Sequence, residues 1–483
     1  MTQTSSEPLS LSLPWRLALA IAAGALLSAG YALHPLWWAP WLAPAPLILA
    51  ASGGKGNARL AGGIAGALAF VMVLGYYANI LGIMTALLAL LRIASWVFAA
   101  RMAEEANRRL PLVLAMFALP VTVTALELIT LLVSVHGAAG SLAYSQMNIP
   151  ALVQVAALGG VPAVIFLVLL PGSFLGAWLA RPRPASGRLT AATVFATLVV
   201  GVSLFSYNRL ATPQPGTTVA ATMIATNRFP GSPKDWHTVW AAYGPAVAQN
   251  ARSGGIVVLP EKIALLEPVQ AGMAAHDLSL AAQATGATLV TGLEVHDGGP
   301  VYHNRAVVAR PDGSLAWYDK QRMVPVFEDR DVPGKTPLLL KAAAIEMGVA
   351  ICKDMHIPSI GHEYAGQAAV LAVPAWDFGR DGWMGARMTQ MRGIESGYAI
   401  IRSSRNGLAG AYDDKGRILA EKVSDDGMTV VTAEVPAMAR HTVYAMLGNA
   451  FGYLCCLLLA GLWLSQWLRP KAAAQAAAQA AGD

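Results

Sequence analysis

Three residues of types that can carry covalent catalysis lie at the ends of short apolar runs in the second half of the chain. They are Glu261, Lys320 and Cys352, and each follows a run that is typical of a buried strand. A thiol needs a nearby base or cation to act as a nucleophile at neutral pH. Glu261 can serve as that base, and the ammonium of Lys320 can stabilise negative charge on an acyl oxygen.

Cys352 taken alone is open to two interpretations. The chain has 3 cysteines, and the other two, Cys455 and Cys456, lie in a long hydrophobic segment, so Cys352 has no obvious disulfide partner. A lone thiol packs well as a small hydrophobe, and a lone lysine or glutamate is usually a solvated strand end. The ordered set of glutamate, lysine and cysteine at three strand ends favours a nucleophile over an inert thiol.

The segment that carries these residues, 212–440, combines turn signals, charges and short apolar runs, which is typical of a globular α/β domain with a layered sheet core. Continuous apolar strands indicate burial on both faces. The pattern predicts strands at 255–259, 287–295, 343–351 and 368–373, helices at 235–251, 268–285 and 382–397, and hairpin turns at 311–313 and 413–416.

The rest of the chain is too apolar for an ordinary soluble enzyme. Of 483 residues, 55% are hydrophobic and only 13% are charged, and the mean hydropathy is +0.49. The net charge of +6 comes from basic residues scattered over loops, which favours membrane topology over nucleic-acid binding. About eight runs are long enough to span a bilayer: 12–32, 36–52, 58–78, 80–100, 110–134, 151–180, 187–207 and 443–468.

Lysine and arginine gather in every other loop, which predicts that both termini are cytoplasmic and that the α/β domain lies on the outer face. Four regions follow: a bundle of about seven helices at 1–211, the α/β domain at 212–440, a C-terminal membrane helix at 441–470 and a flexible cytoplasmic tail at 471–483. Arg92 and Glu127 lie inside predicted spans, where charges are costly, so we expect them to pair or, alternatively, to contact a substrate.

The order Glu-Lys-Cys resembles the catalytic set of the nitrilase, or carbon-nitrogen hydrolase, superfamily. With its membrane spans on both sides of the domain, the chain is similar to the apolipoprotein N-acyltransferases. Four segments resemble motifs of that family: the loop 141–146, the stretch from Lys320 to Glu328, the helix with Arg392 and Glu395, and the strand end 402–407.

The resemblance implies an extracytoplasmic αββα domain, with Glu261 as base, Lys320 as oxyanion partner and Cys352 as nucleophile. Further residues that it implies at the site are Glu328, Asp354, Trp236, Trp376, Phe378 and Asn406. It implies no cofactor, and the histidines show no metal-ligand spacing. It also implies an enzyme of a bacterial-type inner membrane that moves an acyl chain from phospholipid, through a cysteine thioester, to a lipoprotein N-terminus, without nucleic acid.

Two departures from the family pattern keep other functions open. Lys353 stands where the family has an aromatic neighbour of the cysteine, and its charge can lower the thiol pKa. Lys320 and Cys352 are only 32 residues apart, because an arm that the family has between them is largely missing. The short arm favours a membrane-tethered amidase that uses the same triad with water. A non-catalytic scaffold that binds a lipidated partner is the third hypothesis.

Overall fold

The computed structural model describes residues 11–480 except 215, 297 and 343. Its N-terminal part is helical up to residue 211. The helices are α1 Leu13–Tyr31, α2 Ala39–Leu42, α3 Pro44–Ala51, α4 Lys55–Ala69, α5 Val71–Leu81, α6 Met84–Arg109, α7 Leu112–Ala115, α8 Ala118–Val133, η1 Leu142–Gln146, α9 Pro150–Val153, α10 Ala156–Ala180 and α11 Ala185–Ala211. Two more, α16 Val443–Leu447 and α17 Ala450–Ala480, follow the α/β domain.

All eight predicted spans contain helix, but their lengths differ. Five described helices are long and apolar enough to cross a membrane, and a sixth span arises if α4 and α5, bent by 59° at Phe70, count as one. The apolar helices at Ala39–Ala51 and Ala450–Ser465 are shorter. The structure therefore supports a membrane bundle, while the count of eight crossings stays a prediction.

The predicted tail at 471–483 differs from the structure. Helix α17 continues to Ala480, because the stretch after Lys471 consists almost entirely of alanine and glutamine, which have high helix propensity. The remaining residues, 481–483, lie outside the described residues.

The segment from 218 to 436 forms two sheets, as the sequence predicts. One has the order β13-β1-β2-β4-β5-β6, with β3 paired to β4, and the other has the order β12-β11-β10-β9-β8-β7. The strands are β1 Thr218–Ala225, β2 Ile256–Val258, β3 Leu265–Leu266, β4 Thr288–His296, β5 Tyr302–Ala309, β6 Leu315–Asp319, β7 Leu338–Ala342, β8 Ile345–Val349, β9 Val370–Trp376, β10 Ala399–Arg405, β11 Leu408–Tyr412, β12 Ile418–Val423 and β13 Thr429–Pro436. Both predicted hairpin turns are confirmed, since β5 pairs with β6 and β11 with β12, each antiparallel.

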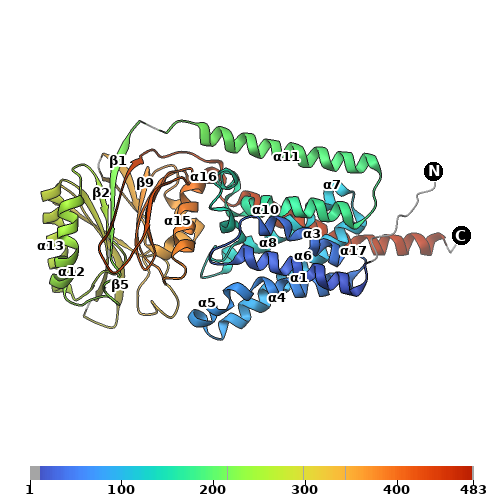
Figure 1. Cartoon of the computed structure of the whole chain (residues 1–483), viewed down its shortest axis with the longest axis horizontal. Coiled ribbons are helices and arrows are strands. Elements are labelled where there is room, and N and C mark those ends of the chain that lie inside the picture. The colour runs from blue at the N-terminus through green and yellow to red at the C-terminus, as the bar shows by residue number, and fades with distance from the viewer. Residues whose placement is uncertain (1–10, 215, 297, 343, 481–483) are drawn as a thin grey trace.

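The domain has four layers (Figure 1). Helices α12 Trp236–Asn250 and α13 Pro268–Thr285 cover the first sheet, and α15 Gly382–Ser396 covers the second, with the short elements η2 Cys352–His356 and α14 Pro358–Glu363 beside it. Buried side chains of both sheets form the central core. This αββα order places α15 between the second sheet and the bundle, while α11 runs along the bundle and leads into β1 (Figure 1).

A buried ion pair on α15 joins the domain to the bundle. Arg392 Nη1 lies 3.1 Å from Glu395 Oε2, and both side chains are almost completely buried. Arg392 also donates to the Tyr144 hydroxyl at 3.3 Å, and Glu395 accepts the backbone N–H of Val161 at 2.8 Å. Because Tyr144 and Val161 belong to the helical part, this pair fixes how the α/β domain sits on the bundle.

Candidate active site

Glu261 and Cys352 meet at the end of β9. The turn after β2 brings the Glu261 N–H to the Ala375 carbonyl at 3.2 Å, and the Cys352 thiol donates to the carbonyl of the next residue, Trp376, at 3.6 Å. Pro260 lacks an N–H and cannot continue the ladder of β2, so the chain turns there. The two sheets therefore bring the predicted base and nucleophile to the same strand end.

Lys320 lies between two carboxylates. Its Nζ is 2.7 Å from Oε1 of Glu261 and 2.8 Å from Oε2 of Glu328. The three side chains are between 1% and 5% exposed, so little water screens these contacts. Burial disfavours the charge of Lys320, but Glu261 and Glu328 outweigh it and raise its pKa. Burial opposes the charge of Glu328 too, yet Lys320 and Lys262 lower its pKa to about 2.

Asn304 joins the same two carboxylates and was not predicted from the sequence. Its Nδ2 donates to Glu261 Oε1 at 2.7 Å and to Glu328 Oε1 at 2.6 Å, and its side chain is fully buried. The signal that could have found it is the hairpin register. Counting back from the turn at 311–313 places Asn304 opposite Lys320, whose N–H donates to the Asn304 carbonyl at 2.9 Å.

Cys352 opens the short helix η2 in a conformation that a non-glycine residue rarely adopts, with φ at +43°. Such strain persists only where surrounding contacts hold it, and it is common at active sites. Burial, and then Glu261, raise the thiol pKa, against the opposing effect of Lys320. The resting thiol is therefore neutral, and a nucleophilic attack by its sulfur requires a base at that moment.

Asp354 holds the cysteine turn against the loop that follows Lys320. Its carboxylate accepts the Tyr318 hydroxyl at 2.8 Å, the Ile351 N–H at 3.0 Å and the Arg322 N–H at 2.9 Å. Burial raises its pKa to about 6. Asp354 thus lies two residues from Cys352 with its hydrogen bonds directed at the backbone and at Tyr318, and its role at the site stays a prediction.

Lys353 does not direct its ammonium at the thiol as a hydrogen-bond donor. Its Nζ donates to the Met323 carbonyl at 2.7 Å, in the loop that leads to Glu328. Burial, followed by the charge of Lys320, lowers its pKa to about 8.

Three aromatic residues lie close in the chain to the site: Trp376 ends β9, Phe378 follows it, and Phe327 precedes Glu328. The Arg405 guanidinium lies 3.4 Å from the ring centroid of Trp376. Phe378 and Phe327 are exposed, and their ring centroids are 4.9 Å apart. Asn406, with φ at +53°, turns the chain after β10, and its N–H donates to Asn227 Oδ1 at 2.6 Å.

Trp236 is not brought to this cluster. It begins α12, its ring is completely buried, and its Nε1 donates to Asp277 of α13 at 2.8 Å. It packs with Leu259 and other residues between the first sheet and the outer helices. The large apolar ring, at a helical spacing from Trp240, is better satisfied in that core than in a polar site.

The expected pair inside the membrane bundle is confirmed. Arg92 Nη1 lies 3.5 Å from Glu127 Oε1. Glu127 also accepts the Tyr31 hydroxyl at 2.9 Å and the Ser141 hydroxyl at 2.7 Å. Ser141 begins the loop that carries Tyr144, so the pair anchors the same loop that contacts α15.

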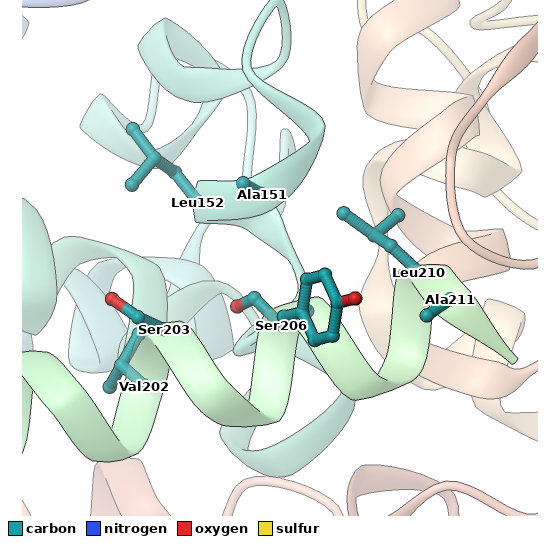
Figure 2. Close-up of a pocket in the computed structure, with 8 residues that line it drawn as sticks. Ala151, Leu152, Val202, Ser203, Ser206, Leu210 and Ala211 are labelled. Carbon is teal, nitrogen blue, oxygen red and sulfur yellow. The ribbon is translucent and has the colours of Figure 1, made fainter.

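An apolar pocket of about 330 Å³ lies apart from the predicted site residues. Figure 2 shows it between α9 and α11, and its lining is Ala151, Leu152, Val202, Ser203, Ser206, Tyr207, Leu210 and Ala211. None of the three residues of the Glu-Lys-Cys set contributes to it, so the pocket gives no information about the chemistry.

Comparison with known proteins agrees with both parts of the chain. A family model of the apolipoprotein N-acyltransferase N-terminal domain matches residues 23–174, and the carbon-nitrogen hydrolase model matches residues 236–444. The apolipoprotein N-acyltransferase of Pseudomonas aeruginosa is 30% identical over 169 residues, which cover 33% of this chain and 31% of the relative. The chain thus aligns with about a third of the length of that relative.

Longer alignments have lower identity. The apolipoprotein N-acyltransferase of Pseudomonas putida is 26% identical over 353 residues, covering 65% of this chain and 68% of the relative, and that of Vibrio parahaemolyticus is 24% identical over 367 residues, covering 68% and 70%. A solved amidase from Nesterenkonia sp. is 19% identical, with a TM-score of 0.40, over 46% of this chain and 92% of that one. The chain therefore joins an apolipoprotein N-acyltransferase N-terminal domain to a carbon-nitrogen hydrolase domain, and it is similar to apolipoprotein N-acyltransferases over about two thirds of its length.

Proposed function

We propose that this chain is a membrane N-acyltransferase that moves an acyl chain from a phospholipid, through a thioester on Cys352, to the N-terminal amine of a lipoprotein. In the first step the Cys352 sulfur attacks an ester carbonyl carbon of the phospholipid, and the thiol proton passes to Glu261. The tetrahedral intermediate then collapses to the thioester. The lysophospholipid leaves as an alcohol after it takes the proton from Glu261.

In the second step the amine attacks the thioester carbon and gives a proton to Glu261. The sulfur leaves and recovers that proton, so the products are an N-acyl amide and the free thiol. Lys320 stabilises the oxyanion in both steps, because its ammonium is a buried positive charge that Glu261 and Glu328 hold in place with three hydrogen bonds. Exclusion of water protects the thioester from hydrolysis.

The proposal includes the domain boundaries and the membrane orientation predicted from the sequence. The catalytic domain, 212–440, lies on the outer face of an inner membrane. The bundle, 1–211, and the helix 441–470 lie in the membrane, and both termini lie in the cytoplasm. The alternation of basic loops supports this orientation. The position of the domain beyond one end of the bundle is consistent with it (Figure 1).

The observation that carries the proposal is the contact of Lys320 with Glu261 at 2.7 Å, beside a buried thiol held in a strained turn. A neutral thiol with a raised pKa needs a base during attack. Glu261 is the carboxylate that can serve, because its N–H contacts the Ala375 carbonyl near the end of β9 and its charge acts on the Cys352 thiol. The names of the relatives support the choice of acyl acceptor, and the membrane bundle supports a lipid as the acyl donor.

An amidase that uses water is the second candidate. Only residues 329–337 separate Glu328 from β7, and Phe327 and Phe378 are exposed beside this short connection. A short connection leaves the site open to small amides and to water. The same two rings, however, present an apolar surface suited to an acyl chain.

One experiment separates these functions. Purified protein is incubated with phospholipid radiolabelled in its acyl chains, and label on Cys352 is tested for release by hydroxylamine. We expect labelling in the wild type and in Cys456→Ala, none in Cys352→Ala, and transfer of the label to an added diacylglyceryl lipopeptide. Turnover of a soluble amide without labelling would replace the acyltransferase by the amidase, and no activity of either kind would favour a scaffold.

A further inference from the structure

Lys262, the residue after Glu261, is a second buried cation beside the catalytic set. Its side chain is 7% exposed, and its Nζ lies 3.2 Å from Glu328 Oε1, 3.2 Å from Glu294 Oε1 and 3.0 Å from Asp331 Oδ2. Glu328 therefore contacts two cations. Lys320 also contacts Glu261, whereas Lys262 also contacts Glu294 and Asp331.

The backbone at Lys262 is held in an unusual conformation that aims this side chain. Its φ is +50°, a region that a lysine seldom occupies. Its carbonyl accepts a hydrogen bond from Arg405 at 2.9 Å and from the Ser232 hydroxyl at 2.8 Å. Arg405 also lies over the ring of Trp376, whose carbonyl accepts the Cys352 thiol, so the turn at Lys262 is tied to the strand end that contacts the thiol.

The charges around Glu328 need this second cation. The charged groups that surround Glu328 are Lys262, Glu294, Lys320, Asp331 and Lys353, and Glu261 lies on the other side of Lys320. Without Lys262, the carboxylates of Glu294, Glu328 and Asp331 would face one another across a buried space with only Lys320 in direct contact. Like charges at that distance cannot all stay ionised.

We propose that Lys262 is a positioning residue that keeps Glu328 ionised and oriented, so that Glu328 holds the Lys320 ammonium against Glu261 in the geometry needed for acyl transfer. Val324 and Asn304 complete the arrangement, since the Val324 N–H donates to Glu328 Oε2 at 2.7 Å and Asn304 donates to Oε1 at 2.6 Å. This inference rests on the proposed function, because it assigns Lys262 a place in that reaction.

The test is the pH dependence of single-turnover thioester formation on Cys352. Loss of a cation in direct contact raises a carboxyl pKa by about 1–3 units. In Lys262→Met we therefore expect the acid limb of the rate profile to move to higher pH, and in Lys262→Arg to stay near that of the wild type. Lys262→Gln repeats the neutral change with a polar side chain in case the methionine variant does not fold. Lys335→Met removes an exposed lysine from the neighbouring connection and should leave the profile unchanged.

A double-mutant cycle assigns the effect to Glu328. In a Glu328→Gln background, Lys262→Met should no longer move the acid limb, because the titrating group is absent. A limb that moves equally in that background, or that is unchanged in Lys262→Met and Lys262→Gln, overturns the inference.

A second readout is independent of the reaction. Between pH 5 and 2.5, the melting temperature of the wild type should fall more steeply than that of Lys262→Met. Lys262 lowers the pKa of Glu328 in the folded protein, so the difference between its folded and unfolded pKa is larger when Lys262 is present. This slope difference without any thioester in the wild type would contradict the proposed function alone. Thioester formation in the wild type, with equal slopes for the two proteins, would contradict only the role of Lys262.

Discussion

Glu261 and Lys320 form a buried ion pair in which Oε1 and Nζ are 2.7 Å apart. The carboxylate that we propose as proton acceptor and the ammonium that we propose as oxyanion partner are thus already in contact without a substrate. Fixed charges in a site with little water need little reorganisation during the reaction, which is the main source of electrostatic catalysis. The pair also explains why neither residue can be changed without affecting the other.

Glu261→Gln should lower the rate of thioester formation by about 10²–10⁴-fold, the usual loss when a general base is removed. The amide cannot accept the thiol proton, and burial keeps that thiol neutral. Single-turnover labelling of Cys352 measures the rate. Glu346→Gln, which changes an exposed carboxylate on β8, is the matched control, and a normal rate in Glu261→Gln would remove Glu261 from the mechanism.

Asn304→Ala should lower the same rate by about 10–100-fold, because it removes hydrogen bonds to two buried carboxylates, each worth about 1.5–3 kcal/mol. The acid limb of the pH profile should also move to higher pH, since those hydrogen bonds favour the ionised forms. Comparison of the rate profiles of wild type and variant checks both expectations. A lower melting temperature with an unchanged profile would mean that Asn304 serves only the fold.

The low pKa of Glu328 predicts loss of stability in acid. Its folded value of about 2 lies below the ordinary value of 4.5, so its contribution is complete above pH 4.5 and is lost as the pH falls toward 2. Melting temperatures measured across this range should fall in the wild type. The fall should be smaller in Glu328→Gln, because unfolding of that variant takes up about one proton fewer. Equal slopes in the two proteins would show that another group dominates acid unfolding.

Arg392→Met should destabilise the junction between the α/β domain and the bundle. It leaves the Glu395 carboxylate buried without its cation, a loss of about 3–5 kcal/mol. The melting temperature and the proteolysis of the α11–β1 connection measure the effect, with exposed Arg380→Met as control. The double change Arg392→Met with Glu395→Met should be less destabilising than Arg392→Met alone, and the reverse order would contradict the pairing.

The sequence by itself determined the classes of structure, and it singled out the three residues that we propose for the chemistry. Short continuous apolar runs such as 256–258, bounded by turn signals, are typical of strands buried on both faces, and polar residues directly after them lie at strand ends. Long apolar helices required a membrane bundle for the same reason, which is the cost of leaving apolar surface in water. These are local patterns, and Glu261, Lys320 and Cys352 followed from them.

The tertiary structure decided which strand ends meet and which side chains contact the same charged group. The contacts of Glu328 with Asn304 and Lys262 join strands and loops far apart in the chain, and no local pattern contains them. The resemblance implies Trp236 at the site, but the packing of α12 against the first sheet places its ring in the outer core. The bend between α4 and α5 and the length of α17 likewise differ from what hydropathy predicts. Ion pairs and hydrogen bonds form across distances of about 3 Å in space, which only the packing of the two sheets determines.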